Sequence, residues 1–229
     1  IKKAAELMDQ YGVDYNILTV VTQKTAGHAA EIYNYYKEQG WKYQQYIACL
    51  DPLGEDRGKT PYALNPEQYG MFLTELFNLW YEDWKKGEQP YIRQFENYIG
   101  ILLGYQPESC EQRGSCGTQN VVEADGSVYP CDFYALDEYK LGNFNCNRLE
   151  EIDKKRKEIA FVEQSQIVAE NCKNCKFYKI CKGGCRRNKD FNAMNGEYEN
   201  YFCKSYRIFF DICLERMIQI VEIIKNQKG

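Results

Sequence analysis

The sequence contains one histidine, six prolines and four methionines, and it lacks any long apolar run. The sequence has a single histidine, His28, which excludes a zinc site with two histidines and a Rieske cluster. His28 lies in a polar stretch, and we also exclude a Ser-His-Asp triad. A membrane-spanning helix needs about 20 mostly apolar residues, and no such segment is present. The charges among residues 1–8 are not typical of a signal peptide.

The charge balance also argues against some partners. The formal net charge is -4, so we expect no nucleic-acid partner and no membrane partner. Hydrophobic residues make up 44% of the chain and aromatic residues 15%, which is typical of an ordered globular protein. The eleven cysteines are an odd number, and together with the charged first residues they favour a reducing compartment, the cytoplasm.

Eight of the cysteines fall into two groups. Eight thiolates suit two four-cysteine metal sites, but the first group has three cysteines and the second has five, so one cysteine of the second group must complete the first site. The spacing C-x2-C-x5-C-x3-C, with a fifth cysteine seventeen residues later, favours two iron-sulfur clusters over the alternatives of zinc sites or disulfides. The first group is Cys110, Cys116 and Cys131; the second is Cys172, Cys175, Cys181, Cys185 and Cys203.

The first fifty residues predict an α/β fold. A helix over Ile1–Tyr11 precedes a strand over Tyr15–Val21 whose apolar run predicts burial on both faces. Thr22 or Thr25 is expected to cap a second helix, and a second strand follows over Tyr43–Leu50. This order indicates parallel strands, and two such strands cannot cover their own edges. We therefore expect the final units of a partial (β/α) barrel, with further strands upstream.

Two residues near the expected strand ends are candidates for ligand binding. Leu50 lies where the second strand ends, the edge at which α/β sheets bind ligands, so it can contact a cofactor or simply fill the core. Asn65 is expected to cap a long helix with an apolar stripe through Trp84, and a shorter helix is expected over Tyr91–Leu103. Arg93, in this shorter helix, can bind a substrate carbonyl or lie at the surface.

The first cysteine group includes a predicted β-hairpin. Strands at 121–123 and 127–129 flank an Asp-Gly turn, which returns Cys131 to the neighbourhood of Cys116. Asp132 follows Cys131 directly, and we expect the aromatic residues on both sides to shield its carboxylate from water. Asp132 is a candidate general base, and the alternative is an aspartate that caps the turn.

The second group lies in a basic stretch that ends with paired glycines and two arginines, CKGGCRR. Glycine N–H groups can donate to cluster sulfurs, and the cations can stabilise a reduced cluster. A zinc knuckle that binds RNA is an alternative interpretation of this stretch. A charged helix over 148–159 separates the groups, and an apolar helix is expected after Cys203. We expect Cys146 to bind no metal and Cys49 and Cys213 to be packed thiols.

The cysteine spacing, with the segments DGSVYPCDFY and CKGGCRRN, resembles the SPASM domain of radical-SAM enzymes that modify peptides. Within that group the whole chain is similar to the anaerobic sulfatase-maturating enzymes. The resemblance implies a partial α/β barrel over residues 1–104 followed by a small α+β SPASM domain with a hairpin and a C-terminal helix over residues 105–229. The C-x3-C-x2-C motif of the family is absent, so we expect this chain to be a C-terminal portion that is inactive alone.

The resemblance also implies which residues hold the cofactors. One auxiliary [4Fe-4S] cluster takes Cys185 together with the first cysteine group, and the other takes the remaining four, Cys172, Cys175, Cys181 and Cys203. Asp132 is implied to be the catalytic base, Leu50 to lie near S-adenosylmethionine, and Arg93 near the peptide. S-adenosylmethionine and a third [4Fe-4S] cluster belong to the part of the family fold that this sequence lacks.

The implied reaction is oxidation of a cysteine or serine in an unfolded or nascent sulfatase peptide to Cα-formylglycine. A 5'-deoxyadenosyl radical removes a β hydrogen, the base takes the thiol or hydroxyl proton, and the auxiliary clusters accept an electron. A low-potential donor such as ferredoxin or flavodoxin is the implied redox partner. The alternatives are another SPASM peptide-modifying enzyme, which forms thioethers or matures a cofactor, and a non-catalytic zinc-binding module.

Overall fold

A computed structural model describes residues 1–228, which form two compact units. Of the described residues, the first unit contains 1–105 and 202–228, and the second contains 106–201. The domain expected from the sequence over 105–229 therefore contributes its C-terminal helix to the first unit. None of the helices in the described residues combines the length and apolar character of a membrane span.

The first unit contains the predicted parallel sheet. Its strands are β1 (Ile17–Val21), β2 (Tyr43–Ala48) and β3 (Tyr91–Ile92), in that order and all parallel. Ile17 is opposite Gln44, and this register puts Thr19 beside Tyr46. The prediction of parallel strands is therefore confirmed, and β1 forms one edge of the described sheet.

One face of this sheet is covered by helices α2 (Ala29–Glu38) and α3 (Pro66–Trp84). The Tyr36 hydroxyl is 2.8 Å from Thr19 Oγ1, and the Tyr46 and Phe72 rings are 5.6 Å apart. On the other face, Leu18 and Val20 are 62% and 52% exposed. The prediction that β1 is buried on both faces is wrong, because the described helices pack on one side.

The start of α2 also differs from the prediction. Thr22 and Thr25 hydrogen-bond to each other, with Thr22 N–H donating to Thr25 Oγ1 at 2.8 Å, so they form a turn before the helix. The N-cap position is His28. Upstream, α1 (Lys2–Gln10) ends before Gly12, whose φ of 65° suits a glycine. The prediction that Thr22 or Thr25 caps α2 is wrong, because their hydroxyl groups hydrogen-bond within this turn and not to the start of the helix.

The segment after α3 contains a strand that the sequence pattern did not predict. Tyr91 and Ile92 form β3, and α4 (Arg93–Leu102) begins at the next residue. The Gln94 side chain hydrogen-bonds to the backbone N–H and C=O of Tyr46, and so extends the pairing of β2 beyond β3. A strand of two residues is too short to show an alternating pattern of apolar and polar residues. The helical pattern of the residues that follow therefore extends over Tyr91 and Ile92 in the sequence.

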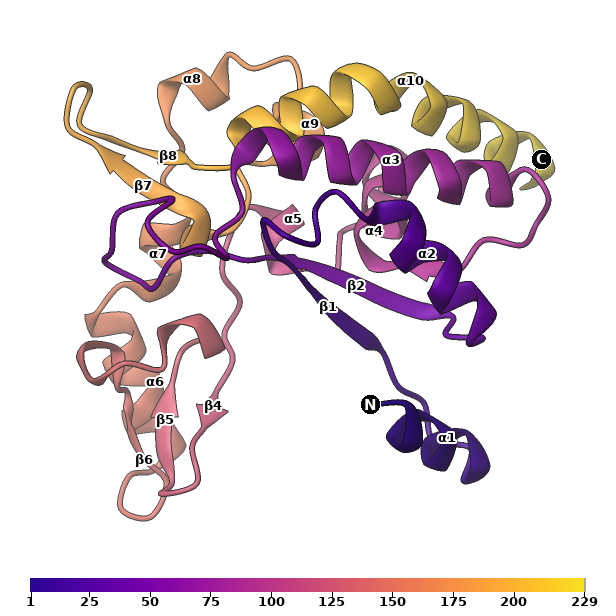
Figure 1. The fold of residues 1–229 in the computed structure, drawn as a ribbon. Coiled ribbons are helices and arrows are strands. Elements are labelled where there is room, and N and C mark those ends of the chain that lie inside the picture. Colours follow the sequence, from indigo (N-terminus) through magenta and orange to yellow (C-terminus); the bar gives the residue numbers. More distant parts are fainter. Residues whose placement is uncertain (229) are drawn as a thin grey trace. The chain divides into compact units, whose positions relative to one another are not determined.

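The core of the first unit lies between α3 and α10 (Cys203–Lys228), which run side by side in Figure 1. Gly70 allows the close approach, because a Cβ there would lie 3.0 Å from the Ser205 carbonyl oxygen. The predicted apolar stripes of both helices are buried and meet through aromatic pairs such as Phe77 and Phe209, 5.9 Å apart. The Asn65 side chain accepts the Gln68 N–H at 2.9 Å, so the predicted cap is confirmed.

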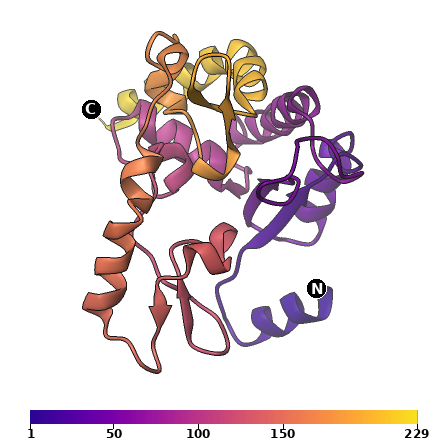
Figure 2. The same cartoon turned by 90° about the vertical axis from the view of Figure 1, so that its left-hand side faces the viewer.

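The second unit is a chain of short elements (Figure 2). Its first sheet contains the predicted hairpin and a strand that was not predicted, β6. Val128, Leu141 and Ile152 form a small core between this sheet and the predicted charged helix α6. The elements are α5 (Cys110–Arg113), β4 (Val121–Val122), β5 (Ser127–Tyr129), η1 (Asp132–Tyr134), η2 (Asp137–Tyr139), β6 (Gly142–Asn143), α6 (Leu149–Glu158), α7 (Phe161–Ser165), α8 (Glu170–Lys173), α9 (Tyr178–Cys181), η3 (Arg186–Asn188), β7 (Lys189–Asn192) and β8 (Glu197–Asn200).

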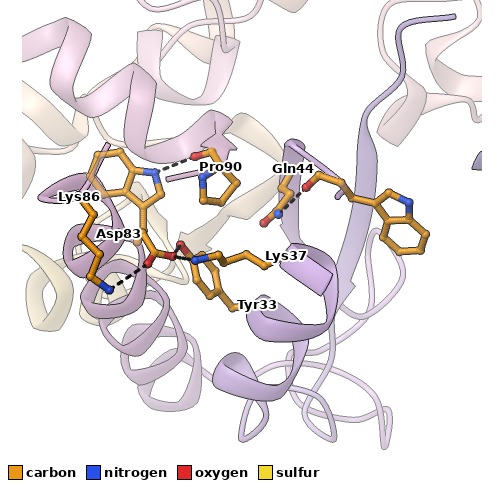
Figure 3. Close-up of polar contacts among 8 residues, drawn as sticks. Tyr33, Lys37, Gln44, Asp83, Lys86 and Pro90 are labelled. Carbon is orange, nitrogen blue, oxygen red and sulfur yellow. Dashed lines mark hydrogen bonds and ion pairs between the residues drawn. The ribbon is translucent and has the colours of Figure 1, made fainter. Parts of the chain in front are cut away.

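A buried carboxylate joins α2 to α3 in the first unit (Figure 3). Asp83 is 6% exposed and accepts hydrogen bonds from the Tyr33 hydroxyl at 2.7 Å and Lys37 Nζ at 2.5 Å. Lys86 Nζ lies 3.7 Å from its other oxygen. Burial alone would raise the pKa of Asp83, but the bonds from Lys37 and Tyr33 outweigh it and lower the pKa.

We expect Asp83→Asn to lower the unfolding free energy by about 2 kcal/mol, because it leaves the Lys37 ammonium without its buried counter-charge. Since the folded pKa is lowered, the stabilisation is present above the unfolded pKa and is lost as pH falls through the folded pKa. Urea unfolding at neutral and acidic pH measures both effects. Glu82→Gln, which changes an exposed ion pair with Lys85, is the control; an equal loss in both variants contradicts the prediction.

Candidate metal centre

The first cysteine group occupies one side of the second unit. Cys110 begins α5, Cys116 follows it and is half-buried, and Cys131 comes directly after the β4–β5 hairpin. Gly126, in the hairpin turn, has a φ of 85°, as the Asp-Gly pattern predicts. The sequence thus places three thiols through one short helix and one hairpin.

A close backbone contact brings the second group to the first. A Cβ on Gly114, which ends α5 with a φ of 71°, would lie 2.2 Å from the carbonyl oxygen of Lys182. Asn188 Nδ2 donates to Glu111 Oε1 at 3.3 Å across the same junction. Gly183 and Gly184 both have positive φ, and this turn carries the chain on to Cys185.

Electrostatic interactions link the thiol of Cys116 to those of Cys110, Cys131 and Cys185, and the thiol of Cys110 to that of Cys185. Negative charge on Cys110 and Cys116 disfavours ionisation of Cys185, and charge on Cys116 does so for Cys131. Burial raises the pKa of Cys131 to about 12, helped by a hydrogen bond to Asp132, and burial also raises the pKa of Cys185. The sharing of one metal site by these four cysteines remains a prediction.

Two cations favour the ionised form of the Cys116 thiol. The Arg186 guanidinium stacks over Phe161 at 4.6 Å and donates to the Phe161 carbonyl and the Gln164 side chain, both at 2.7 Å. Arg186 and Lys189 both lower the pKa of Cys116, although burial raises it more strongly. The sequence shows a basic stretch around the second cysteine group. It does not indicate that the charges of Arg186 and Lys189 act on Cys116 in the first group.

The cysteines of the second group are divided between the two units. Cys172 lies in α8, and Cys175 follows in a tight turn in which its N–H donates to the Cys172 carbonyl at 3.1 Å. Cys181 ends α9, and all three are half-buried. Cys203 begins α10 and belongs to the first unit, so its share in this site remains a prediction.

The donor set fits iron-sulfur clusters. Among the described residues, no three or more His, Cys, Asp or Glu side chains form a group that could hold a single metal ion. Cluster thiolates bind separate irons and need not meet at one point. Half-buried thiols beside fixed cations, with glycine backbone close by, suit an anionic cluster held by sulfur.

Asp132 lies beside this centre but is not shielded as expected. Cys131 Sγ donates to Asp132 Oδ1 at 3.2 Å, so carboxylate and thiol are in contact. Asp132 is exposed and Phe133 is 44% exposed. The expectation of aromatic shielding is wrong, because η1 directs Tyr134 inward, where its ring lies 5.1 Å from Phe161, and leaves the other two residues outside.

Leu50 and Arg93 both belong to the first unit. Leu50 is half-buried and follows β2. The next residue, Asp51, anchors the following loop by accepting the N–H groups of Gly58 at 2.7 Å and Thr60 at 2.8 Å. Arg93 Nη1 donates to the Gln45 side chain at 2.9 Å. Their roles toward S-adenosylmethionine and peptide remain predictions.

The remaining cysteines have three different environments. Cys213 is fully buried in α10, so the prediction of a packed thiol is confirmed. Cys49 is half-buried, and burial, followed by the charge of Asp51, raises its pKa. Cys146 is exposed, and its Sγ lies 3.6 Å from the Asn143 carbonyl oxygen.

Comparison with known proteins gives a consistent result. Residues 110–176 match the family model SPASM, an iron-sulfur cluster-binding domain. A cysteine-type anaerobic sulfatase-maturating enzyme of Clostridium perfringens (strain 13 / Type A) is 45% identical over 98% of this chain, which spans 61% of the length of that relative. A serine-type enzyme of Bacteroides thetaiotaomicron is 28% identical over 100% of this chain, which spans 59% of that relative.

A solved structure, native anSMEcpe with bound AdoMet and Cp18Cys peptide, superposes with a TM-score of 0.90. It is 44% identical and matches 97% of this chain and 62% of its own chain. The chain thus spans about three-fifths of the length of the relatives that it matches.

We expect Gly114→Ala to reduce the iron bound after anaerobic reconstitution, because a methyl group against the Lys182 carbonyl separates Cys110 from Cys185. Gly117→Ala is the matched control, since no atom lies within 4 Å of the position its Cβ would take. Iron and sulfide analysis measures the effect. Equal iron content in both variants contradicts the role of this contact.

Proposed function

We propose that this chain, a relative of the anaerobic sulfatase-maturating enzymes over almost its whole length, is the C-terminal part of an enzyme that oxidises a cysteine or serine of a sulfatase to Cα-formylglycine. The observation that carries the proposal is the contact between Cys131 and Asp132 in the region that matches a cluster-binding domain. This contact puts a proton acceptor next to a site for an electron acceptor.

The proposed reaction needs both functions at one place. The substrate side chain loses a hydrogen atom from its β carbon, a proton from sulfur or oxygen, and one electron. A cysteine product then exchanges its sulfur for the oxygen of water and releases sulfide. Asp132 is the group that accepts the proton, and its contact with Cys131 keeps the proton acceptor beside the ligands of the first site.

Two auxiliary [4Fe-4S] clusters complete the proposal. Bound clusters would supply one-electron acceptors, and S-adenosylmethionine with a third [4Fe-4S] cluster would be held by the part of the protein outside this chain. Cys185 would complete the first site with the three cysteines of the first group. Cys172, Cys175, Cys181 and Cys203 would hold the second cluster.

The first unit would bind substrate and co-substrate. Leu50 would contact S-adenosylmethionine from the end of β2, where parallel sheets place their ligands. Arg93, positioned by Gln45, would donate hydrogen bonds to the carbonyl groups of the peptide. The solved neighbour carries AdoMet and a peptide, which supports a peptide as the partner.

The remaining partners follow from the redox chemistry. Each turnover requires electron exchange with a low-potential carrier such as a ferredoxin or flavodoxin. Reduced thiols and clusters suit an oxygen-poor cytoplasm. We propose no nucleic-acid or membrane partner. The substrate peptide must be unfolded or nascent, because the side chain that reacts has to reach Asp132.

A second candidate is another SPASM enzyme that forms thioethers or matures a cofactor, since the match over residues 110–176 is to the domain alone. Mass spectrometry of a sulfatase peptide after reaction distinguishes these activities, because formylglycine and a thioether differ in mass. A non-catalytic zinc module is the third candidate, and the absence of visible absorption would identify it. Similarity to sulfatase-maturating enzymes along 98% of the chain favours the first proposal.

In the full-length enzyme we expect Asp132→Asn to lower formylglycine formation by about 10²–10⁴-fold while S-adenosylmethionine cleavage persists, because the base is lost but hydrogen abstraction is not. Asp137→Asn, which removes a nearby exposed carboxylate of η2, is the control and should retain activity. Both products are quantified by mass spectrometry. If Asp132→Asn forms as much formylglycine as the wild-type enzyme, Asp132 is not the catalytic base.

We expect this chain to bind about eight irons and eight sulfides when reconstituted anaerobically, as two four-iron clusters require. Cys185→Ala should lose about half of the iron, because the first site keeps three thiolates. Cys146→Ala removes an exposed thiol outside both groups and should bind iron normally. Full iron content in Cys185→Ala contradicts the proposed crossover.

A further inference from the structure

Each cysteine of the second group is followed directly by a basic residue, whereas glutamate, glycine and aspartate follow the three cysteines of the first group. The segment 171–187 contains six basic residues and no acidic residue, although the whole chain has a formal net charge of -4. Positive charge is therefore concentrated at the second cysteine group. The pairs are Cys172-Lys173, Cys175-Lys176, Cys181-Lys182, Cys185-Arg186 and Cys203-Lys204.

Three lysines of this segment are exposed to solvent. Lys173 ends α8, Lys179 lies in α9, and Lys176 lies in the segment that connects these two helices (Figure 1). Lys173 and Lys176 each follow a half-buried cysteine directly, Cys172 and Cys175. We call these three exposed lysines the lysine surface. It belongs to the same short segment as three of the proposed ligands of the second cluster.

Two local contacts position the lysine surface. Lys176 Nζ lies over the buried Phe177 ring, 4.6 Å from its centroid. Lys173 Nζ lies 2.9 Å from Glu170 Oε2, but both of these side chains are more than half exposed, and exposed ion pairs contribute little stability. The Lys173 ammonium can therefore exchange this pair for a carboxylate of a partner protein.

Carboxylates adjoin the first cysteine group. Asp132 is exposed and accepts a hydrogen bond from Cys131 Sγ at 3.2 Å. Glu111, which follows Cys110, is half-buried and accepts a hydrogen bond from Asn188. Like charges that face each other across an interface disfavour association. An acidic partner protein is therefore attracted to the second group and not to the first, where we place the substrate.

We propose that the lysine surface is the docking site for a small acidic electron-carrier protein, which exchanges electrons with the second cluster. The inference rests on the proposed function, because it needs a cluster at the second site. Ferredoxins and flavodoxins are acidic proteins, and complementary charge raises the rate at which such partners associate. The oxidised carrier takes up one electron from the reduced second cluster, and no bond is formed or broken and no proton is transferred.

The experiment measures carrier binding to the anaerobically reconstituted full-length enzyme by calorimetric titration. The probes are a bacterial two-cluster ferredoxin and, separately, a flavodoxin. We expect a triple variant, Lys173→Gln with Lys176→Gln and Lys179→Gln, to bind the preferred carrier about tenfold more weakly at low ionic strength, because three exposed charge pairs are lost. The difference should shrink at high ionic strength, where salt screens exposed charges.

The matched control replaces Lys154, Lys155 and Lys157 by glutamine, because these exposed lysines of α6 carry the same total charge in the same unit. The control should bind the carrier as the wild-type enzyme does. Equal binding by the two triple variants, or no binding of either carrier to the wild-type enzyme, overturns the inference. Single-stranded RNA that binds more tightly than both carriers, and only while the lysine surface is intact, also overturns it.

Iron content and formylglycine formation with dithionite are measured on the same samples. If the triple variant loses iron, the single variant Lys179→Gln decides, because Lys179 follows no cysteine directly. It should weaken carrier binding about threefold, whereas Lys157→Gln should not, and equal binding by these two variants overturns the inference. A wild-type enzyme that forms no formylglycine contradicts the proposed function, and the binding result still decides the docking surface.

Discussion

The second unit depends on a contact between two backbones. Gly114, at the end of α5, lies so close to the Lys182 carbonyl that a side chain at that position would overlap it. This contact places the segment that carries Cys110 and Cys116 against the turn that precedes Cys185. The core of Val128, Leu141 and Ile152 is small, so the contact between Gly114 and Lys182 contributes to the geometry of this unit.

The first unit is stabilised in a different way. Its core is an aromatic layer between α3 and α10, with Asp83 as a buried anchor for the Tyr33 and Lys37 side chains. The sheet is covered on one face, and Leu18 and Val20 on the other face are exposed. This unit therefore has an exposed sheet face and contains Cys203, whereas the second unit contains the other seven cysteines of the two groups.

Charge compensation connects the structure of the second unit to its proposed chemistry. Burial disfavours ionisation of the thiols, and Arg186 and Lys189 oppose that effect at Cys116. Both cations are held by carbonyl groups or aromatic rings, which leaves their charge available to the cysteines. A site of this kind favours an anionic cofactor and stabilises added electrons.

The sequence alone determined the parallel βαβ order, the Asn65 cap and the hairpin before Cys131, because these follow from periodicity and turn chemistry. The cysteine count predicts that one cysteine of the second group joins the first, and the family resemblance assigns that role to Cys185. Only the tertiary structure decided that one face of β1 is exposed, that Asp132 is exposed, and that the charges of Arg186 and Lys189 act on Cys116. Local patterns record what one segment prefers. The exposure of a side chain and the charges around it depend on segments distant in the sequence, which only the folded chain brings together.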